Sequence, residues 1–314
     1  MYAQKANAER FSKKEKMTKV NKHQIYFIIF SAITILLCAI SGILMINKPE
    51  VKLNISIIMV VSMSLIGTIG VAHGALDGKI IWKHSVRTSA RLKLYLLYML
   101  FTSSGALIWF FYPFGGLVLL LIMSSVHFGI SDLKFINEMN FASKVYWGVA
   151  MAFLPLVFKP NLVNSLFYDL TQVRIQPEIF SAIKIIVLIC IIDFCVSLYK
   201  IAKERKKKGK TILELKLLSA EMMVLICLAY FLSPLIWFSI YFCGLHGIRA
   251  LIDSDFRIFP DILWLTLFTA PISIMIFLFK WEYSLNSLLI VFPVLASLTI
   301  AHMFLPKLRE IVKP

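Results

Sequence analysis

Charge is scarce in this sequence, and acidic charge is the scarcest. Only 16% of the 314 residues are Asp, Glu, Lys or Arg, where soluble domains average about 25%, and 59% are hydrophobic. This shortage excludes a water-soluble domain and predicts an all-α, polytopic transmembrane helix bundle. The excess of 33 Lys and Arg over 17 Asp and Glu does not indicate nucleic-acid binding, because the basic residues lie in short loops between apolar runs. That placement indicates orientation in a membrane and attraction to anionic lipid.

Cysteine is also sparse. The five cysteines are scattered through apolar stretches and form no CxxC pair, so we interpret them as small buried hydrophobic side chains. Histidine numbers only six, and the sequence has no HxxxH or HxxHH box. The absence of these boxes argues against a di-iron membrane desaturase or hydroxylase.

Ten apolar stretches are long enough, or nearly long enough, to cross a bilayer. They fall at residues 24–46, 53–77, 92–112, 115–134, 143–158, 178–200, 212–231, 234–252, 262–280 and 285–306. We therefore expect a basic cytoplasmic N-terminal segment over residues 1–22 and a single transmembrane helical domain of about ten helices over residues 23–314. The first apolar run is longer than the core of a cleavable signal, which predicts a retained first helix.

Basic residues alternate from loop to loop. The N-terminus, the loops after the second, fourth, sixth and eighth stretches, and the C-terminal tail are rich in Lys and Arg, whereas the intervening loops are poor in them. By the positive-inside rule both termini should be cytoplasmic, in a multi-pass protein of the inner (cytoplasmic) membrane.

Four of the six histidines lie inside apolar stretches at nearly the same depth. They are His73, His127, His246 and His302, and each comes a few residues before the basic end of a stretch that runs toward the cytoplasm. Imidazole in hydrocarbon is costly unless it is paired or bound, so four at one depth predict a shared metal ion. Imidazole suits Zn, Cu, Fe and Ni, and the ligand type alone does not choose among them. His23 and His84 lie in basic flanks, and we interpret them as solvated.

Three carboxylates accompany these histidines. Asp77 lies four residues after His73, on the same helical face, and Asp132 lies five residues after His127. A carboxylate beside a ligating imidazole fixes its tautomer and raises its basicity. Glu221 falls at the same depth in the seventh stretch, where it either orients a histidine or serves as a structural partner. Small residues beside the histidines, such as Gly74 and Gly129, predict close helix approach.

At these residues the chain resembles the Brp/Blh family of bacterial and archaeal membrane β-carotene 15,15′-dioxygenases. The family pattern runs roughly PHGxxD, HFGxxD, YFxxxHSxRH and PHM. This chain reads VAHGALD, SVHFGISD, YFCGLHGIRA and IAHMF in the same order, from the second stretch to the C-terminus.

The resemblance implies a ferrous, non-haem iron and O₂-dependent cleavage of β-carotene at its central double bond into two all-trans-retinal molecules. It implies that His73, His127 and His246 are iron ligands and suggests a functional link to a microbial rhodopsin. The substrate, a long apolar rod dissolved in the bilayer, would need a lateral slot lined by aromatic side chains.

The chain departs from the family pattern at one ligand position. The second histidine of HSxRH is replaced by Ala250. Three outcomes stay open at this point: His302 completes the site, a water or carboxylate does, or the chain has lost the activity. In the last case it would be a non-catalytic carotenoid- or retinal-binding or transport protein.

Overall fold

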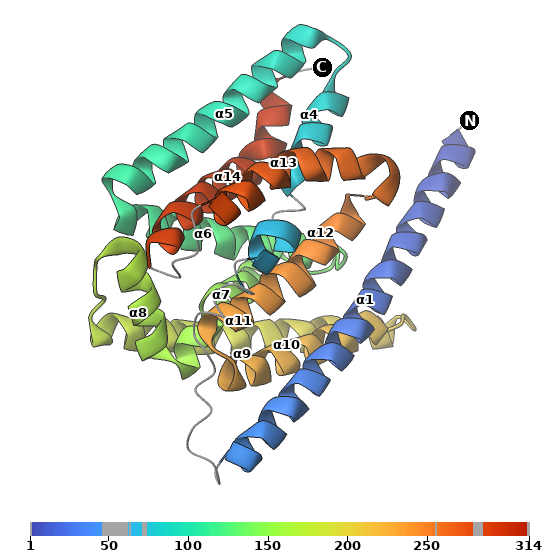
Figure 1. Cartoon of the computed structure of the whole chain (residues 1–314). Helices are drawn as coiled ribbons and strands as arrows, with labels where there is room; N and C mark the ends of the chain where they lie inside the picture. The colour runs from blue at the N-terminus through green and yellow to red at the C-terminus, as the bar shows by residue number, and fades with distance from the viewer. Residues whose placement is uncertain are drawn as a thin grey trace.

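The computed structural model describes residues 2–45, 62, 64–70, 74–254, 256–278 and 285–312, and their regular secondary structure is helical throughout. The elements, labelled as in Figure 1, are α1 (Tyr2–Met45), the π-helix η1 (Ile66–Gly70), α4 (Asp77–His84), α5 (Thr88–Phe111), α6 (Pro113–Asp132), α7 (Phe141–Phe158), α8 (Pro160–Thr171), α9 (Pro177–Lys207), α10 (Leu213–Phe231), α11 (Pro234–Ser239), the π-helix η2 (Ile240–Gly247), α12 (Ile248–Asp253), α13 (Ile258–Leu278) and α14 (Leu285–Ile311). The predicted all-α class is confirmed. Six of the described helices are long and apolar enough to cross a membrane, as a polytopic membrane protein requires. The number of spans stays a prediction.

Proline sets the start of several helices. Pro113, Pro160, Pro177 and Pro234 each occupy the first turn of a helix, where a missing N–H costs nothing and the fixed φ favours the helical conformation. Helix α7 is instead capped by Asn140, the residue before it, whose side chain accepts a hydrogen bond from the Ser143 amide at 2.8 Å. These signals explain why the middle of the chain follows the predicted stretches closely.

Three features of the helices go beyond the expectation. Helix α1 begins at Tyr2, so the basic segment is helical over residues 2–22 and continuous with the first predicted span. The sequence does not predict the twelve-residue helix α8, because it is too short to span a bilayer. The eighth stretch is one continuous helix, Pro234–Asp253, whose middle part, η2, is π-helical. Most of the predicted span 53–77 lies outside the described residues.

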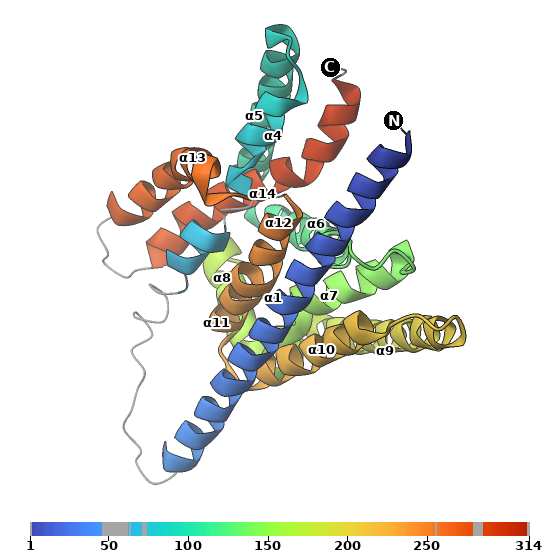
Figure 2. The same cartoon turned by 90° about the vertical axis from the view of Figure 1, so that its right-hand side faces the viewer.

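The helices pack in an open bundle around α6 and α7 (Figure 1). Helices α9 and α10 lie side by side at one end of the view, α5 lies along α14 at the other, and α1 runs along the outside of α10 and α12. The start of α1 and the end of α14 lie at the same end of the molecule in both views (Figures 1 and 2). This arrangement agrees with two termini on one side of a membrane; that this side is the cytoplasm stays a prediction.

Polar contacts join the segments predicted to lie on the cytoplasmic side. Lys134 pairs with Asp253 at 2.6 Å, and Lys79 pairs with Asp261. The buried Arg205 guanidinium at the end of α9 donates to Glu138, at 2.8 Å, and to Glu214. This hydrogen bonding holds the pKa of Glu138 below its usual value. Loops assigned to one side by charge alone therefore contact one another in space.

Helices α6 and α7 approach each other closely at two glycines. A Cβ built on Gly129 would lie 1.9 Å from the Lys144 carbonyl oxygen, and one built on Gly148 would lie 1.6 Å from the Ser125 carbonyl oxygen. Both obstacles are backbone atoms, so the two helices touch only because these positions lack side chains. The predicted role of Gly129 is thus confirmed, whereas a Cβ on Gly74 would meet nothing within 4 Å.

Candidate metal centre and adjoining cavity

Three of the four membrane histidines meet in the structure. His127 on α6 lies between His246 on η2 and His302 on α14, with ring centroids 5.2 Å and 5.3 Å away respectively. The three residues are far apart in sequence and come from three separate elements, so the helix packing alone brings them together. His73 lies outside the described residues.

The centroid distances from His127 to its two neighbours can be compared with those of two imidazoles bound to one ion. An imidazole bound through Nε2 at about 2.1 Å places its centroid about 3.2 Å from the ion, so two ligands in tetrahedral geometry have centroids about 5.2 Å apart. The Nε2 atom of His127 is buried and has no hydrogen-bond partner within the described residues, as a nitrogen reserved for a metal would be. Among the described residues, which include His127, His246 and His302 but not His73, no three His, Cys, Asp or Glu side chains are placed to hold a metal ion together. The metal role of the four histidines stays a prediction.

Asp132 holds His246 in place. Its Oδ1 lies 2.7 Å from His246 Nδ1, and both side chains are fully buried. An ionised carboxylate only accepts hydrogen bonds, so Nδ1 carries the ring proton and Nε2 is the nitrogen suited to coordination. The other oxygen, Oδ2, accepts from Trp147 Nε1 at 3.0 Å and from the Tyr241 hydroxyl at 2.7 Å. Three donors thus fix one carboxylate behind one imidazole.

Asp77 holds His302 in the same way, through a carboxylate contact to its ring Nδ1. The two Asp77 oxygens lie 2.8 and 2.9 Å from His302 Nδ1, and the Tyr98 hydroxyl donates to Oδ2 at 3.0 Å. Each aspartate therefore supports a histidine from a different part of the chain. Helical spacing in the sequence shows only neighbours on one helix, such as Asp77 and His73, so it does not reveal these two contacts. Whether Asp77 also lies beside His73 stays a prediction.

Glu221 makes no hydrogen bond to a histidine among the described residues. Its Oε1 accepts from Arg249 at 2.6 Å, and its Oε2 accepts from Gln24 at 3.0 Å. Arg249 also donates to the Asp132 carbonyl oxygen at 3.0 Å. Among the described residues Glu221 is therefore a hydrogen-bond partner of Arg249 and Gln24, and whether it orients His73 stays a prediction.

The interpretation of His23 and His84 as solvated is also wrong. His23 Nε2 lies 2.8 Å from the Gly244 carbonyl oxygen, and His84 Nε2 lies 2.6 Å from the Val312 carbonyl oxygen. Both rings are half-buried at helix contacts. Sequence analysis also missed Trp147, Tyr98 and Tyr241, whose polar tips reach the aspartates. The available signal was an aromatic side chain with a hydrogen-bonding tip inside an apolar stretch.

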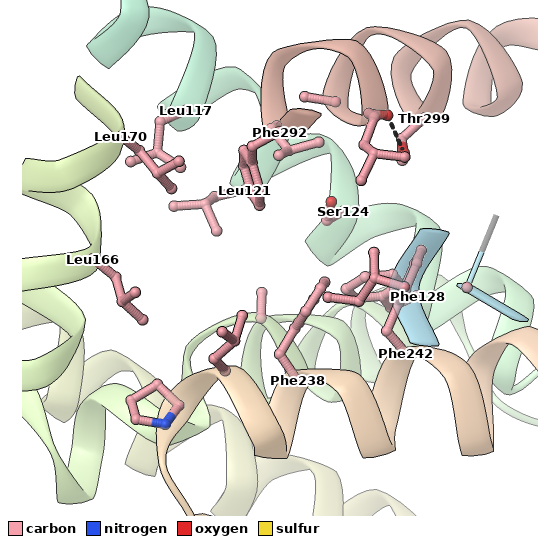
Figure 3. A pocket seen from close by; sticks show the side chains of 18 of the residues that line it. Leu117, Leu121, Ser124, Phe128, Leu166, Leu170, Phe238, Phe242, Phe292 and Thr299 are labelled. Atoms are coloured by element: carbon pink, nitrogen blue, oxygen red, sulfur yellow. Dashed lines mark hydrogen bonds between the residues drawn. The ribbon is translucent and has the colours of Figure 1, made fainter. Parts of the chain in front are cut away.

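An apolar cavity of ≈ 220 Å³ adjoins the histidines (Figure 3). His302 lines it, and so do Phe128 and Phe242, whose rings pack against His246 with centroids 4.8 and 5.7 Å away. Leu166 and Leu170 of α8 line the opposite side in Figure 3. The unpredicted helix α8 therefore forms a wall of this cavity. The geometry provides an apolar chamber with an imidazole cluster beside it.

Comparison with known proteins agrees with this arrangement. A family model described as Beta-carotene 15,15′-dioxygenase matches residues 64–308. The chain belongs to this family. A curated protein of an uncultured marine bacterium, 66A03, named Beta-carotene 15,15′-dioxygenase, is 31% identical over 198 residues, which cover 60% of this chain and 66% of that protein. No solved structure matches the chain.

The family match includes all four histidines, both aspartates and the whole cavity lining. The resemblance stated from the sequence motifs is confirmed. Helix α1 ends at Met45, before the matched region begins at residue 64. This member of the dioxygenase family thus carries a long N-terminal helix that the match does not cover.

Proposed function

We propose that this chain cleaves β-carotene with O₂ at the central double bond to give two all-trans-retinal molecules. The observation that carries the proposal is the meeting of His127, His246 and His302 beside an apolar cavity, in a member of the β-carotene 15,15′-dioxygenase family. The reaction balances with O₂ as the sole co-substrate: one C=C bond breaks, and each carbon takes one oxygen atom.

The proposed cofactor is one ferrous ion held by His73, His127, His246 and His302. When bound, it supplies the binding and reduction of O₂, which an all-nitrogen ligand set with an open position suits. Asp132 and Asp77 keep the Nδ1 protons of His246 and His302, so that Nε2 of each ring stays available to the ion. The departure at Ala250 fits this set, because His302 supplies a fourth imidazole.

The cavity would hold the polyene. Its lining, which includes Phe128, Phe242 and Phe292, offers apolar contact along a rod-shaped hydrocarbon and keeps water from the reacting bond. The substrate would enter from the lipid of the inner membrane, with both termini in the cytoplasm. A microbial rhodopsin would be the consumer of the retinal produced.

Co-expression with a β-carotene pathway tests the activity. Wild-type chain is expected to bleach the orange cells and to yield retinal by chromatography. His127→Ala should remove bound iron and lower retinal yield by more than about 100-fold, since losing an outer-shell partner alone costs 10–100-fold in many metal sites. Well-expressed wild-type protein that leaves β-carotene unchanged would remove the reaction from consideration.

A second candidate function follows from Ala250. Without the family's second histidine on that helix, the chain would bind a carotenoid or retinal without cleaving it. Pigment that copurifies with a metal-free wild-type protein would favour this function. Iron in the wild type that is lost in His127→Ala would favour the oxygenase.

Filling the cavity should block cleavage without removing metal. Ser124 lies in the lining between Leu121 and Phe128 (Figure 3), so Ser124→Phe places a ring in the space proposed for the polyene. We expect retinal yield to fall by more than about tenfold at unchanged iron content, because the added ring would occupy the space that the polyene needs and the surrounding packed side chains cannot move aside. The matched control is Val118→Phe, on the exposed face of the same helix, which should behave as wild type. Equal activity in both variants would place the substrate elsewhere.

A further inference from the structure

Helix α1 places two adjacent polar side chains against the elements that carry the candidate site. Gln24 is fully buried, and its Nε2 donates to Glu221 Oε2 at 3.0 Å. His23 Nε2 lies 2.8 Å from the carbonyl oxygen of Gly244, two residues before His246 in η2. Both contacts come from a helix outside the region that matches the family. The position of α1 against α10 and α12 is visible in Figures 1 and 2.

The Gln24 contact is the start of a continuous buried chain of hydrogen bonds. Glu221 Oε1 accepts from Arg249 at 2.6 Å, and Arg249 donates to the backbone oxygen of Asp132 at 3.0 Å. The Asp132 side chain then lies 2.7 Å from His246 Nδ1. Glu221, Asp132 and His246 are each 0% exposed, and Arg249 is 3% exposed. No bulk water is in contact with these groups to replace a missing partner.

Because these groups are buried, the loss of any one hydrogen bond in this series is costly. A buried carboxylate that loses a hydrogen-bond donor is left with a desolvation penalty, typically about 1–3 kcal/mol and more for a charged group. Glu221 without Gln24 would have to turn toward another donor, and Arg249 would follow the Glu221 carboxylate to which it is bonded. Since Arg249 also fixes the α6 backbone at Asp132, the displacement would reach the carboxylate that orients His246.

A simple membrane anchor would not need these residues. A helix that only holds the protein in lipid is best served by apolar side chains, and a buried glutamine amide inside a span is costly without a fixed partner. The second contact falls on a π-helix, a distortion that frequently marks functional sites. Two neighbouring residues of α1 thus reach the two sides of His246, one through Gly244 and one through Glu221.

We infer that α1 is a positioning element of the histidine site, and that Gln24 is a positioning residue. It acts through Glu221 and Arg249 on the Asp132–His246 pair. The inference rests on the proposed function, because it assigns α1 to the proposed metal and cleavage site. Helix α1, which lies outside the region matched by the family model, would thus help to build the site as well as insert into the membrane.

The test is Gln24→Leu in the full-length chain, with metal affinity as the main readout. Titration of the metal-free protein with Fe(II), or with Co(II) as a spectroscopic probe, should show binding about three- to tenfold weaker than wild type, less than for an outer-shell partner in direct contact with a ligand. The kcat for β-carotene should fall while its KM stays unchanged, because Gln24 does not line the cavity. The matched control is Thr34→Val, which removes a hydroxyl bonded only to its own helix, at Phe30, and should match wild type.

A milder variant covers the case in which Gln24→Leu does not fold. Gln24→Asn keeps the amide on a shorter stem and should weaken metal binding by a smaller factor. Wild-type metal affinity in whichever of these variants folds would overturn the inference. If the wild-type protein binds metal but leaves β-carotene intact, the proposed reaction is wrong, and the inference about α1 is then tested by metal affinity alone. If the wild-type protein binds no metal, both the proposed function and the inference about α1 are wrong.

Discussion

Gly148→Ala is expected to leave little folded protein. The new Cβ would lie 1.6 Å from the Ser125 carbonyl oxygen and 2.9 Å from the Gly129 amide nitrogen, so α6 and α7 would have to move apart along their contact. Backbone atoms cannot escape by changing rotamer, and overpacking at such a point costs about 3 kcal/mol or more. Thermal unfolding in detergent, together with the yield of monodisperse protein, measures the effect.

The matched control is another glycine-to-alanine change. A Cβ on Gly244 would lie 3.5 Å from the Phe27 ring, an ordinary contact, so Gly244→Ala should keep nearly the wild-type melting temperature. Gly129→Ala should reproduce the loss seen with Gly148→Ala, because its Cβ would lie 1.9 Å from the Lys144 carbonyl oxygen. A Gly148→Ala protein that melts within a few degrees of wild type would mean that α6 and α7 do not approach each other this closely.

The same close approach explains why the glycines matter for the site. Helix α6 carries His127 and Asp132, and α7 carries Trp147, one residue before Gly148. Trp147 reaches Asp132 across this contact at 3.0 Å. A separation of the two helices would therefore remove a donor from the carboxylate behind His246 even in protein that survives folding.

The depth of each histidine in the membrane can be predicted from the sequence, because it depends only on the position of the residue along its own helix. Hydropathy places the spans and the basic loops orient them, so these two patterns suffice to assign His127, His246 and His302 to one slab. The meeting of their rings is consistent with that assignment. Proline and asparagine at helix starts are also local signals, which is why most boundaries agree.

The partners across helices are not predictable in this way, because they depend on how each helix rotates about its axis. Helical periodicity places Asp77 on the face of His73, yet packing sets it against His302, 225 residues away. The Gln24–Glu221 and Glu221–Arg249 contacts depend on the same rotation, which no sequence pattern records. Helix α8 is missed for another reason. It lines a cavity and does not span the bilayer, so neither the length of an apolar stretch nor a pattern of charge identifies it.

Asp132→Asn is expected to lower activity strongly in protein that still folds and keeps its histidines. Its Oδ1 faces His246 Nδ1 at 2.7 Å, and its Oδ2 accepts from both Trp147 and Tyr241. An asparagine offers one acceptor oxygen and one NH₂ donor, so at least one buried donor would face another donor. The imidazole of His246 would lose either its orientation or its Nδ1 partner.

We therefore expect Asp132→Asn to weaken metal binding by about 10–100-fold, to lower retinal formation at least as much, and to destabilise the protein by about 1–3 kcal/mol. Metal content, single-turnover cleavage and thermal unfolding measure the three effects separately. Tyr241→Phe is the matched control, because it removes one of the three donors and leaves the carboxylate against His246; it should cost about 1 kcal/mol and keep activity within a few-fold. Wild-type metal content and turnover in Asp132→Asn would show that the carboxylate does not hold His246 for coordination, and the candidate centre would then have to be built without this pair.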